Sequence, residues 1–275
     1  MINLIKTNYK WSIAGASLAP LQRYWELFYV LVERSLKVRY RGSLLGVYWS
    51  LLNPLLMTAL YTAIFGTTFA SYYNDSIVDY ILAAFTGLVV IHFFSGSTNQ
   101  ALVSVVENGI LLNKIKLPMV IFPLSMVGGN VFQFCLGMLP VLAIVTLVKS
   151  HSLVNVVALL IPLLSLTLVC TGIGFFVSAL YVFFRDLPYF YELVTFVLWM
   201  SSPVFYPTEI VPPAVEKFLI FNPLVPIIES VRQISLSGAL PDIILMGKAG
   251  ISSSLILAFG WILFRKWQEQ FMDLI

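Results

Sequence analysis

The stretch GSLLGVYWSLLNPLLMTALYTAIFGTTFASYYN, from Gly42 to Asn74, contains no Asp, Glu, Lys or Arg. A helix needs about 20 apolar residues to cross a hydrocarbon core of about 30 Å. This stretch is longer than that, so it predicts a membrane span. Three further charge-free stretches of comparable length predict three more spans: Tyr80–Val106, Leu117–Val148 and Ser150–Phe184.

Two shorter stretches predict the remaining spans. Leu193–Thr208 and Ala249–Phe264 are charge-free, and the second lengthens if it begins at Ile243 and the Lys248 side chain reaches outward to the interface. Glycine and proline residues could break the long spans, although helix extending into water is the simpler explanation for their length. The sequence therefore predicts an all-α polytopic membrane protein with six transmembrane helices, at about residues 44–72, 80–104, 117–147, 153–184, 188–208 and 243–264.

The composition of the 275-residue chain supports this class. Hydrophobic residues make up 59% and charged residues 11%, whereas a soluble globular domain carries roughly 25% charged residues. A mean hydropathy of +0.92 and a net charge of +3 argue against soluble, disordered and nucleic-acid-binding proteins. The two cysteines, Cys135 and Cys170, lie inside apolar stretches and provide neither a disulfide framework nor a zinc site. No metal site and no nucleic-acid partner are expected.

The basic residues indicate how the chain is oriented. With six spans, twelve Lys and Arg residues fall on the side of the two termini and four on the other side. Cytoplasmic loops carry the excess of Lys and Arg, so both termini are expected in the cytoplasm and the chain in the cytoplasmic membrane. Met1–Pro20 has no unbroken apolar run of a cleavable signal peptide. The terminal cytoplasmic parts are then residues 1–41 and the tail, 265–275.

An amphipathic helix is predicted within residues 1–41, ahead of the first span. Apolar residues recur at three- and four-residue steps from Leu21 to Leu36, and polar residues fall largely on the other face. Basic residues together with Trp and Phe suit a helix in the membrane interface, which we favour over a cytoplasmic helix packed on the bundle. Its basic end, KVRYRG, meets lipid phosphate or an anionic headgroup in either arrangement.

The segment 209–242, between the last two spans, is expected on the outer side of the membrane. Its part FLIFNPLVPIIESV is apolar but contains Pro223 and Pro226. Such a segment is too interrupted to span the membrane and too apolar for water, so it predicts short re-entrant or interfacial helices. An external cap packed on the bundle is the alternative.

Catalytic motifs are absent from the sequence. It contains no G-x-x-x-x-G-K-[ST] phosphate-binding loop, no H-E-x-x-H and no G-x-S-x-G. His92 lies within a span, where an ionisable residue is a functional candidate, but a hydrogen-bonded packing residue is the simpler explanation. The scarcity of acidic residues within the spans argues against an ion-coupled carrier, and the lack of clustered acids and histidines argues against a membrane enzyme.

An aromatic row follows the first span. Tyr61, Phe65, Phe69 and Tyr72 recur at steps of four, four and three and therefore share one helix face. The row covers about 16 Å at 1.5 Å per residue, which is more than the single depth of an interfacial aromatic belt. Aromatic faces stack on sugar rings, although packing between helices or subunits is the alternative. The fifth stretch adds further aromatic residues: Phe196, Trp199, Phe205 and Tyr206.

Four stretches resemble the ABC type-2 permeases that export polysaccharides. LKVRYRGSLLGVYWSLLNPLL (36–56) is similar to the start of their first span, and ENGILLNKIKLPMVIFPL (107–124) to the cytoplasmic loop between their second and third spans. YVFFRDLPYFYELVTFVLWMSSPVFYP (181–207) is similar to their fifth span with the turn before it, and FNPLVPIIESVRQ (221–233) to their outer segment. The motifs stand in the family's order, and the resemblance extends from about Tyr24 to the last residue.

The resemblance implies the transmembrane permease subunit of an ATP-driven exporter of lipid-linked polysaccharide, of O-antigen or capsule type, that works as a homodimer. ATP and Mg would be bound by two P-loop ATPase subunits on a separate chain, and this chain would carry no cofactor and no catalytic residue. The family alternatives are teichoic acid, drug or lipid cargo. In the family, the amphipathic helix and the loop after the second span contact the ATPase, which points to Glu33, Arg34, Asn113, Lys114, Arg185 and Asp186.

The resemblance also implies a substrate path between the two copies, lined largely by the first and fifth spans. The pyrophosphate or headgroup of the substrate would meet the basic end of the amphipathic helix at Arg39 and Arg41, because the arginine fork donates bidentate hydrogen bonds to phosphate. Membrane lipid and the lipid-linked glycan are therefore expected partners. The aromatic residues placed toward the sugar path are Tyr61, Phe65, Phe69, Tyr72, Phe196 and Trp199.

Overall fold

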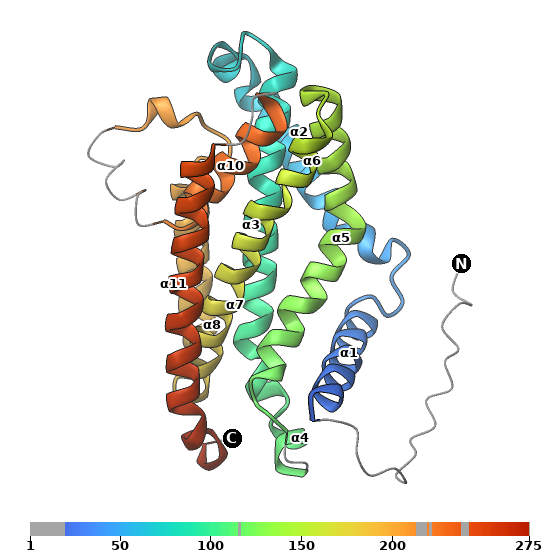
Figure 1. Ribbon diagram of the computed structural model, residues 1–275, viewed down its shortest axis with the longest axis vertical. Helices are drawn as coiled ribbons and strands as arrows, with labels where there is room; N and C mark the ends of the chain where they lie inside the picture. Colours follow the sequence, from blue (N-terminus) through green and yellow to red (C-terminus); the bar gives the residue numbers. More distant parts are fainter. Residues whose placement is uncertain (1–19, 115–116, 213–218, 220–221, 238–241, 275) are drawn as a thin grey trace.

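The computed structural model describes residues 20–114, 117–212, 219, 222–237 and 242–274. In these ranges the chain forms helices and their connections, without a strand. The long helices run side by side along the longest axis of the molecule (Figure 1). The expected all-α class is therefore confirmed.

Five helical segments among the described residues are long and apolar enough to cross a membrane. They correspond to the first four and the last of the predicted spans, and a short helix, α4 (Gly109–Lys114), follows the second of them. Their helices are α2 (Trp49–Phe69) with the 3-10 turns η1 (Gly46–Tyr48) and η2 (Ala70–Tyr72), α3 (Ile77–Glu107), α5 (Ile121–Ser150), α6 (Leu153–Ala158) with α7 (Leu160–Phe183), and α11 (Ile243–Trp267) with η4 (Gln268–Asp273).

The fifth predicted span, residues 188–208, is only partly helical. Helix α8 covers Leu187–Ser201 and is about 22 Å long at 1.5 Å per residue, which is shorter than the hydrocarbon core. The next residue, Ser202, has an extended backbone. The helix stops there because Pro203 disfavours a helical conformation in the residue before it. The next helical turn is η3 (Thr208–Ile210). The count of six crossings therefore stays a prediction.

The two ends of the bundle carry different elements (Figure 1). The lower end in that view carries α4, the turn between α7 and α8, and the C-terminus. The upper end carries the α2–α3 turn, the α5–α6 turn and helix α10 (Leu224–Leu236). We use the names lower end and upper end for these two groups.

Helix α3 lies in the centre of the bundle, and α7 and α11 cross beside it at a pair of glycines. A Cβ atom built on Gly172 of α7 would lie 2.6 Å from the carbonyl oxygen of Ile256 in α11, and one on Gly260 of α11 would overlap the backbone of Gly172. Small residues of this kind let the backbones of membrane helices approach closely. Gly172 thus serves a helix crossing and does not break the fourth span.

The amphipathic helix α1 (Pro20–Arg39) packs its apolar side against α5. Leu31 is buried there with Ile121 and Phe122, and the Phe28 ring fills the space that a side chain at Gly128 would need. The same helix exposes Tyr24 and Trp25, residues that suit a membrane interface. Helix α5 is continuous through Gly128 and Pro140, whereas the fourth span is interrupted at Leu159, between α6 and α7.

The outer segment 209–242 contains the buried helix α10, which packs against α3, α5, α7 and α11. Its apolar side is inaccessible to solvent at Ile227, Ile228, Val231 and Ile234. Asn222 precedes this helix, accepts a hydrogen bond from the Leu224 N–H at 3.0 Å and donates to the Ser202 hydroxyl at 2.9 Å. The expected re-entrant path of the whole segment stays a prediction, since much of it lies outside the described residues.

Candidate functional site: an aromatic face and a basic helix end

The aromatic row of the first span forms one continuous face. The rings of Tyr61 and Phe65 lie 6.3 Å apart, those of Phe65 and Phe69 5.7 Å apart, and those of Phe69 and Tyr72 6.5 Å apart. The predicted helical spacing is therefore confirmed in three dimensions. We call Tyr61, Phe65, Phe69 and Tyr72 the aromatic face.

The structure brings aromatic residues of the fifth stretch onto this face. Phe205, after the end of α8, stacks on Tyr61 with ring centroids 4.8 Å apart and an angle of 5° between the planes, and it lies 6.0 Å from Phe65. Trp199 of α8 contacts Tyr61 edge-on at 6.4 Å, and Phe196 contacts Trp199 at 6.0 Å. The first and fifth stretches thus meet through their aromatic side chains.

The aromatic face retains unused capacity for a ligand. The Tyr72 side chain is exposed, and Tyr61, Phe65 and Phe69 are partly exposed. The indole N–H of Trp199 is buried, and no acceptor among the described residues binds it. The exposed flat apolar area of the aromatic face suits stacking on a sugar ring.

At the end of α1 the two candidate arginines have different environments. The Arg39 guanidinium reaches into the bundle and donates to the side-chain oxygens of Asn130 at 3.2 Å, Gln133 at 2.6 Å, and Gln100. Arg41, two residues later, is exposed and makes no hydrogen bond or ion pair with the described residues. The chain turns at Gly42, where φ is +76° and glycine is strongly favoured.

The amide cluster that binds Arg39 was not predicted from the sequence. Gln100 of α3 also accepts from the Asn130 amide at 2.9 Å, so the cluster joins α1, α3 and α5. Polar side chains in spans that face one another are the signal that could have revealed it, since such residues in membrane helices face the bundle interior. Because all the acceptors of Arg39 are neutral, its charge has no carboxylate partner in the cluster.

The residues proposed to contact an ATPase lie at the lower end, as far as they are described. Arg34 of α1 approaches Asn108, the residue after α3, at 3.4 Å, and Glu33 pairs with Lys37 along the helix at 2.6 Å. Arg185 and Asp186 occupy the exposed turn between α7 and α8, and Arg185 donates to the Leu274 carbonyl at 3.1 Å.

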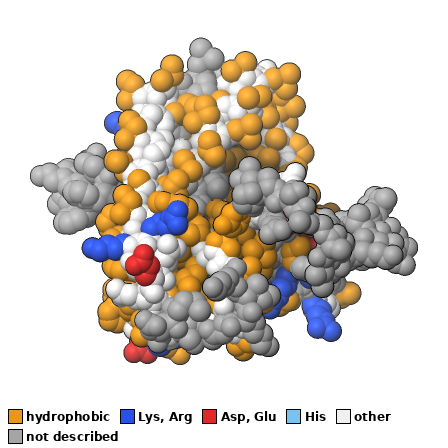
Figure 2. Space-filling view, turned by 60° about the horizontal axis from the view of Figure 1, so that its bottom comes forward, with side chains coloured by type: hydrophobic (Ala, Val, Ile, Leu, Met, Phe, Trp, Pro, Cys, Tyr) orange, Lys and Arg blue, Asp and Glu red, His pale blue; other side chains and the backbone are white. Residues whose placement is uncertain are grey.

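Figure 2 turns the lower end toward the reader and shows charged side chains set in a largely hydrophobic surface. Asn113 and Lys114 end helix α4 at this end. Their side chains lie outside the described part of the structure, so their proposed contact with an ATPase stays a prediction.

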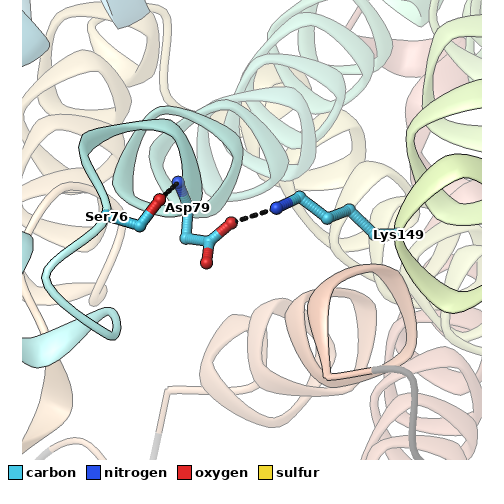
Figure 3. Close-up of polar contacts among 3 residues, drawn as sticks. All are labelled: Ser76, Asp79 and Lys149. Carbon is cyan, nitrogen blue, oxygen red and sulfur yellow. Dashed lines mark hydrogen bonds and ion pairs between the residues drawn. The ribbon is translucent and has the colours of Figure 1, made fainter.

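The upper end is fixed by an ion pair between α3 and α5. Lys149 at the end of α5 binds the carboxylate of Asp79 in the first turn of α3 (Figure 3). Ser76 caps the same helix by accepting from the Asp79 N–H at 3.2 Å. Both charged side chains are partly shielded from water, at 31% and 22% exposure, so the pair holds two helix ends together where they leave the bundle.

Metal-ligating side chains form no cluster within the described ranges. No group of three or more His, Cys, Asp or Glu side chains there could hold a metal ion. The Nδ1 atom of His92 is buried close to the Leu88 backbone, one turn earlier in α3, and the role of His92 as a hydrogen-bonded packing residue stays a prediction.

Comparisons with known proteins agree with the resemblance in the sequence. The family model described as ABC-2 type transporter matches residues 26–236. A Myxococcus xanthus protein named O-antigen export system permease protein RfbA is 31% identical over 93% of this chain and 97% of its own length. A Klebsiella pneumoniae protein of the same name is 28% identical over 91% of this chain and 95% of its length, and a second is 29% identical over 78% and 82%.

Proposed function

Because this chain belongs to the ABC-2 type transporter family, we propose that it is the permease subunit of an ATP-driven exporter that moves lipid-linked polysaccharide of the O-antigen or capsule type across the cytoplasmic membrane. The observation that carries the proposal is the similarity, over nearly the full length, to permeases named for O-antigen export. Five apolar helices of spanning length support a multi-pass membrane protein.

The energy for export would come from partner chains. The sequence has no phosphate-binding loop, so we assign ATP and Mg binding to two ATPase subunits that associate with a homodimer of this chain. The lower end is the proposed cytoplasmic side, because α4 there belongs to the loop that contacts the ATPase in the family, and the α7–α8 turn lies at the same end. Both chain termini would lie in the cytoplasm. ATP binding would act through this end by favouring one arrangement of the helices over another.

The aromatic face is the proposed glycan path. Stacking on successive rings has no single deep energy minimum along the row, so a long sugar chain can slide over it. The rings of Phe205 and Trp199, which contact Tyr61 from the fifth stretch, support this role because they add aromatic area beside the row.

The two arginines would share the headgroup site unequally. Arg41 is exposed and is the better placed first contact for a pyrophosphate. Arg39 would hold the end of α1 on the bundle through its three amide partners, and its charge without a carboxylate partner adds to the positive potential.

The class of cargo can be tested by reconstitution. The permease and the ATPase subunit encoded beside it would be purified together in lipid nanodiscs, and ATP hydrolysis measured with lipid-linked O-antigen, teichoic acid precursor, or drug-like lipid. We expect stimulation by the lipid-linked O-antigen only. Stimulation by another cargo, or cargo movement against a gradient by the permease alone in vesicles, would contradict the proposal.

The path can be tested separately with Phe65→Ala combined with Phe69→Ala. We expect export to fall several-fold while the ATPase subunit still co-purifies. The control is Leu56→Ala combined with Leu60→Ala, two exposed residues of the same helix outside the aromatic face. Loss of the assembled complex in the aromatic variant alone would assign the row to packing instead.

A further inference from the structure

The backbone that follows α8 is non-helical yet fully hydrogen-bonded at four consecutive carbonyls. We call Ser202–Phe205 the unwound segment. The Ser202 carbonyl accepts from the Val204 N–H at 2.7 Å within the segment. The next three carbonyls accept from side chains of other helices. Unsatisfied backbone groups are costly in a membrane protein, so these donors are needed where a helix stops short.

Two side chains supply those donors from two different helices. Arg232 of α10 donates through Nη2 to the carbonyls of Pro203 at 2.7 Å and Val204 at 3.2 Å. The Tyr80 hydroxyl of α3 donates to the Phe205 carbonyl at 2.9 Å. The same Arg232 nitrogen also lies 3.3 Å from the carbonyl of Ala83 in α3. Arg232 therefore joins α10, α3 and the unwound segment.

The unwound segment is held closely against α3. A Cβ atom built on Gly87 would lie 3.0 Å from the Cα of Val204, so a larger residue would push the segment away from α3 by a few tenths of an ångström. The Val204 side chain is 1% exposed. Close packing against Gly87 thus positions the segment beside α3, and hydrogen bonds from Tyr80 and Arg232 hold its carbonyl groups.

The position of this backbone decides where the Phe205 ring lies. With its carbonyl bound by Tyr80, Phe205 places its ring flat on Tyr61. In this arrangement Phe205 covers the Tyr61 end of the aromatic face and leaves Tyr72, at the other end, exposed.

We propose that Tyr80 and Arg232 form a carbonyl clamp that keeps Phe205 on the aromatic face, and that release of the clamp uncovers the face for the substrate. The inference rests on the proposed function for the identity of that substrate. The clamp itself, as a positioning device between α3, α10 and the unwound segment, depends only on the contacts described.

The chemistry of the clamp suits a contact that opens and closes. The hydrogen-bond acceptors of Arg232 are neutral carbonyl groups. Arg232 forms no ion pair with the described residues. Opening the clamp therefore breaks no ion pair, which would be a far larger cost, although it weakens the attraction between Arg232 and the nearby Glu229 carboxylate. The Arg232 Nε–H is already without an acceptor in the described structure, so the guanidinium has a spare donor for a replacement contact.

The clamp can be tested without any transport assay. In a full-length chain whose Cys135 and Cys170 are replaced by alanine, Val204→Cys provides a thiol that the clamp keeps buried. The protein in lipid nanodiscs would be treated with a water-soluble maleimide. Adding Arg232→Gln removes two clamp bonds, and we expect the labelling rate to rise on the order of tenfold. Arg232→Lys, which retains one donor group, should restore part of the protection.

A matched control and a milder variant make the result decisive. Lys248→Gln removes an exposed positive charge of α11 outside the clamp and should leave labelling unchanged. If Arg232→Gln fails to fold, Tyr80→Phe tests the same clamp by removing a single hydroxyl, and it should raise labelling several-fold. Unchanged labelling in a folded Arg232→Gln or Tyr80→Phe protein would overturn the clamp.

Export measurements then separate the clamp from the proposed function. Phe205→Ala leaves the clamped carbonyls in place but removes the ring, and we expect it to change export several-fold. If labelling rises in Arg232→Gln while export by Phe205→Ala and by the Phe65 and Phe69 double variant stays normal, the clamp is supported and the glycan path over this face is wrong.

Discussion

The first two spans are both apolar and free of internal positive charge, yet they occupy different environments. In the most apolar part of the second span, 61% of the residues are buried inside the molecule, against 11% in the first span. Helix α3 buries small polar residues completely, among them Thr86, Ser97, Thr98 and Ser104. Helix α2 exposes large apolar ones: Leu55, Leu56, Leu60 and Ile64. Apolarity thus places a helix in the membrane, but it does not decide whether the helix faces lipid or the inside of the bundle.

This difference has a physical cause. Lipid tails are as apolar as leucine, so membrane helices associate through close packing and hydrogen bonds and gain little from hiding apolar surface. Helix α3 meets this requirement on several sides, against α2, α5, α7 and α10, whereas α2 meets it along the aromatic face and at Pro54, Thr58 and Gly66. The bare side of α2 is consequently available to lipid or to the proposed second copy.

The largest effect on folding is expected from a substitution at the crossing of α7 and α11. Gly260→Leu would push a side chain into the backbone of Gly172, and overpacking of a tight contact costs about 1–3 kcal/mol or more. We expect folded protein in the membrane to be nearly lost, as measured by size-exclusion chromatography after extraction. Gly250→Leu on the same helix is the control, because a Cβ atom there meets nothing within 4 Å. Equal yields of the two variants would contradict the close crossing.

The contrast between α2 and α3 can be measured with one kind of substitution. Leu88→Ala in α3 removes a side chain with no exposed area and should lower the free energy of unfolding by about 2–5 kcal/mol. Leu60→Ala in α2, where the side chain is 53% exposed, should change it by less than about 1 kcal/mol. Thermal unfolding of both variants in the same nanodiscs would test this. Similar losses would mean that α2 packs against something in the purified protein, and a second copy would be the first explanation to examine.

The two arginines at the end of α1 provide a smaller contrast. Arg39→Met would remove the Arg39 donor from Gln100, Gln133 and Asn130, of which Gln100 keeps the Asn130 amide as a donor, and we expect a loss of about 1–3 kcal/mol. Arg41→Met should leave stability unchanged because the side chain is exposed, while export falls if the side chain meets the substrate headgroup. Unfolding midpoints and export rates would be measured for both. A stable Arg39→Met protein with impaired export would assign Arg39 to the headgroup instead.

How much of this could be predicted from the sequence depends on the range of each interaction. Charge-free stretches predicted six spans, of which five are long apolar helical segments among the described residues, and steps of three and four residues predicted the row from Tyr61 to Tyr72. The stacking of Phe205 on Tyr61 could not be predicted. Pro203 indicates that a helix ends, but it does not indicate the direction of the chain after it. The hydrogen-bond partners of Arg39 and Arg232 could not be predicted either, because they lie on elements that are distant in the sequence and meet only in the folded protein.

The smallest effect on stability is expected from a substitution of Glu229, in α10 where it meets the upper end of α3. Burial raises the pKa of Glu229, against the opposing effect of the nearby Arg232; Glu209 raises it further and Lys248 lowers it. A raised pKa means that the folded protein binds this proton more tightly than the unfolded chain. The stability gained from the proton is therefore complete below the ordinary carboxyl pKa, and it is lost as the pH rises through the raised value of the folded state.

Glu229→Gln imitates the protonated side chain at every pH. It should leave the unfolding midpoint unchanged at low pH and raise it above the folded-state pKa, by about 2 °C or less. Asp79→Asn is the matched comparison on α3 itself: it breaks the ion pair with Lys149 and should lower the midpoint at neutral pH. Unfolding midpoints measured across the pH range would reveal the opposite signs. If Glu229→Gln also lowered the midpoint at neutral pH, the carboxylate of Glu229 would be stabilised by Arg232 more than it is penalised by burial, and α10 would be held to the bundle by charge as well as by its apolar side.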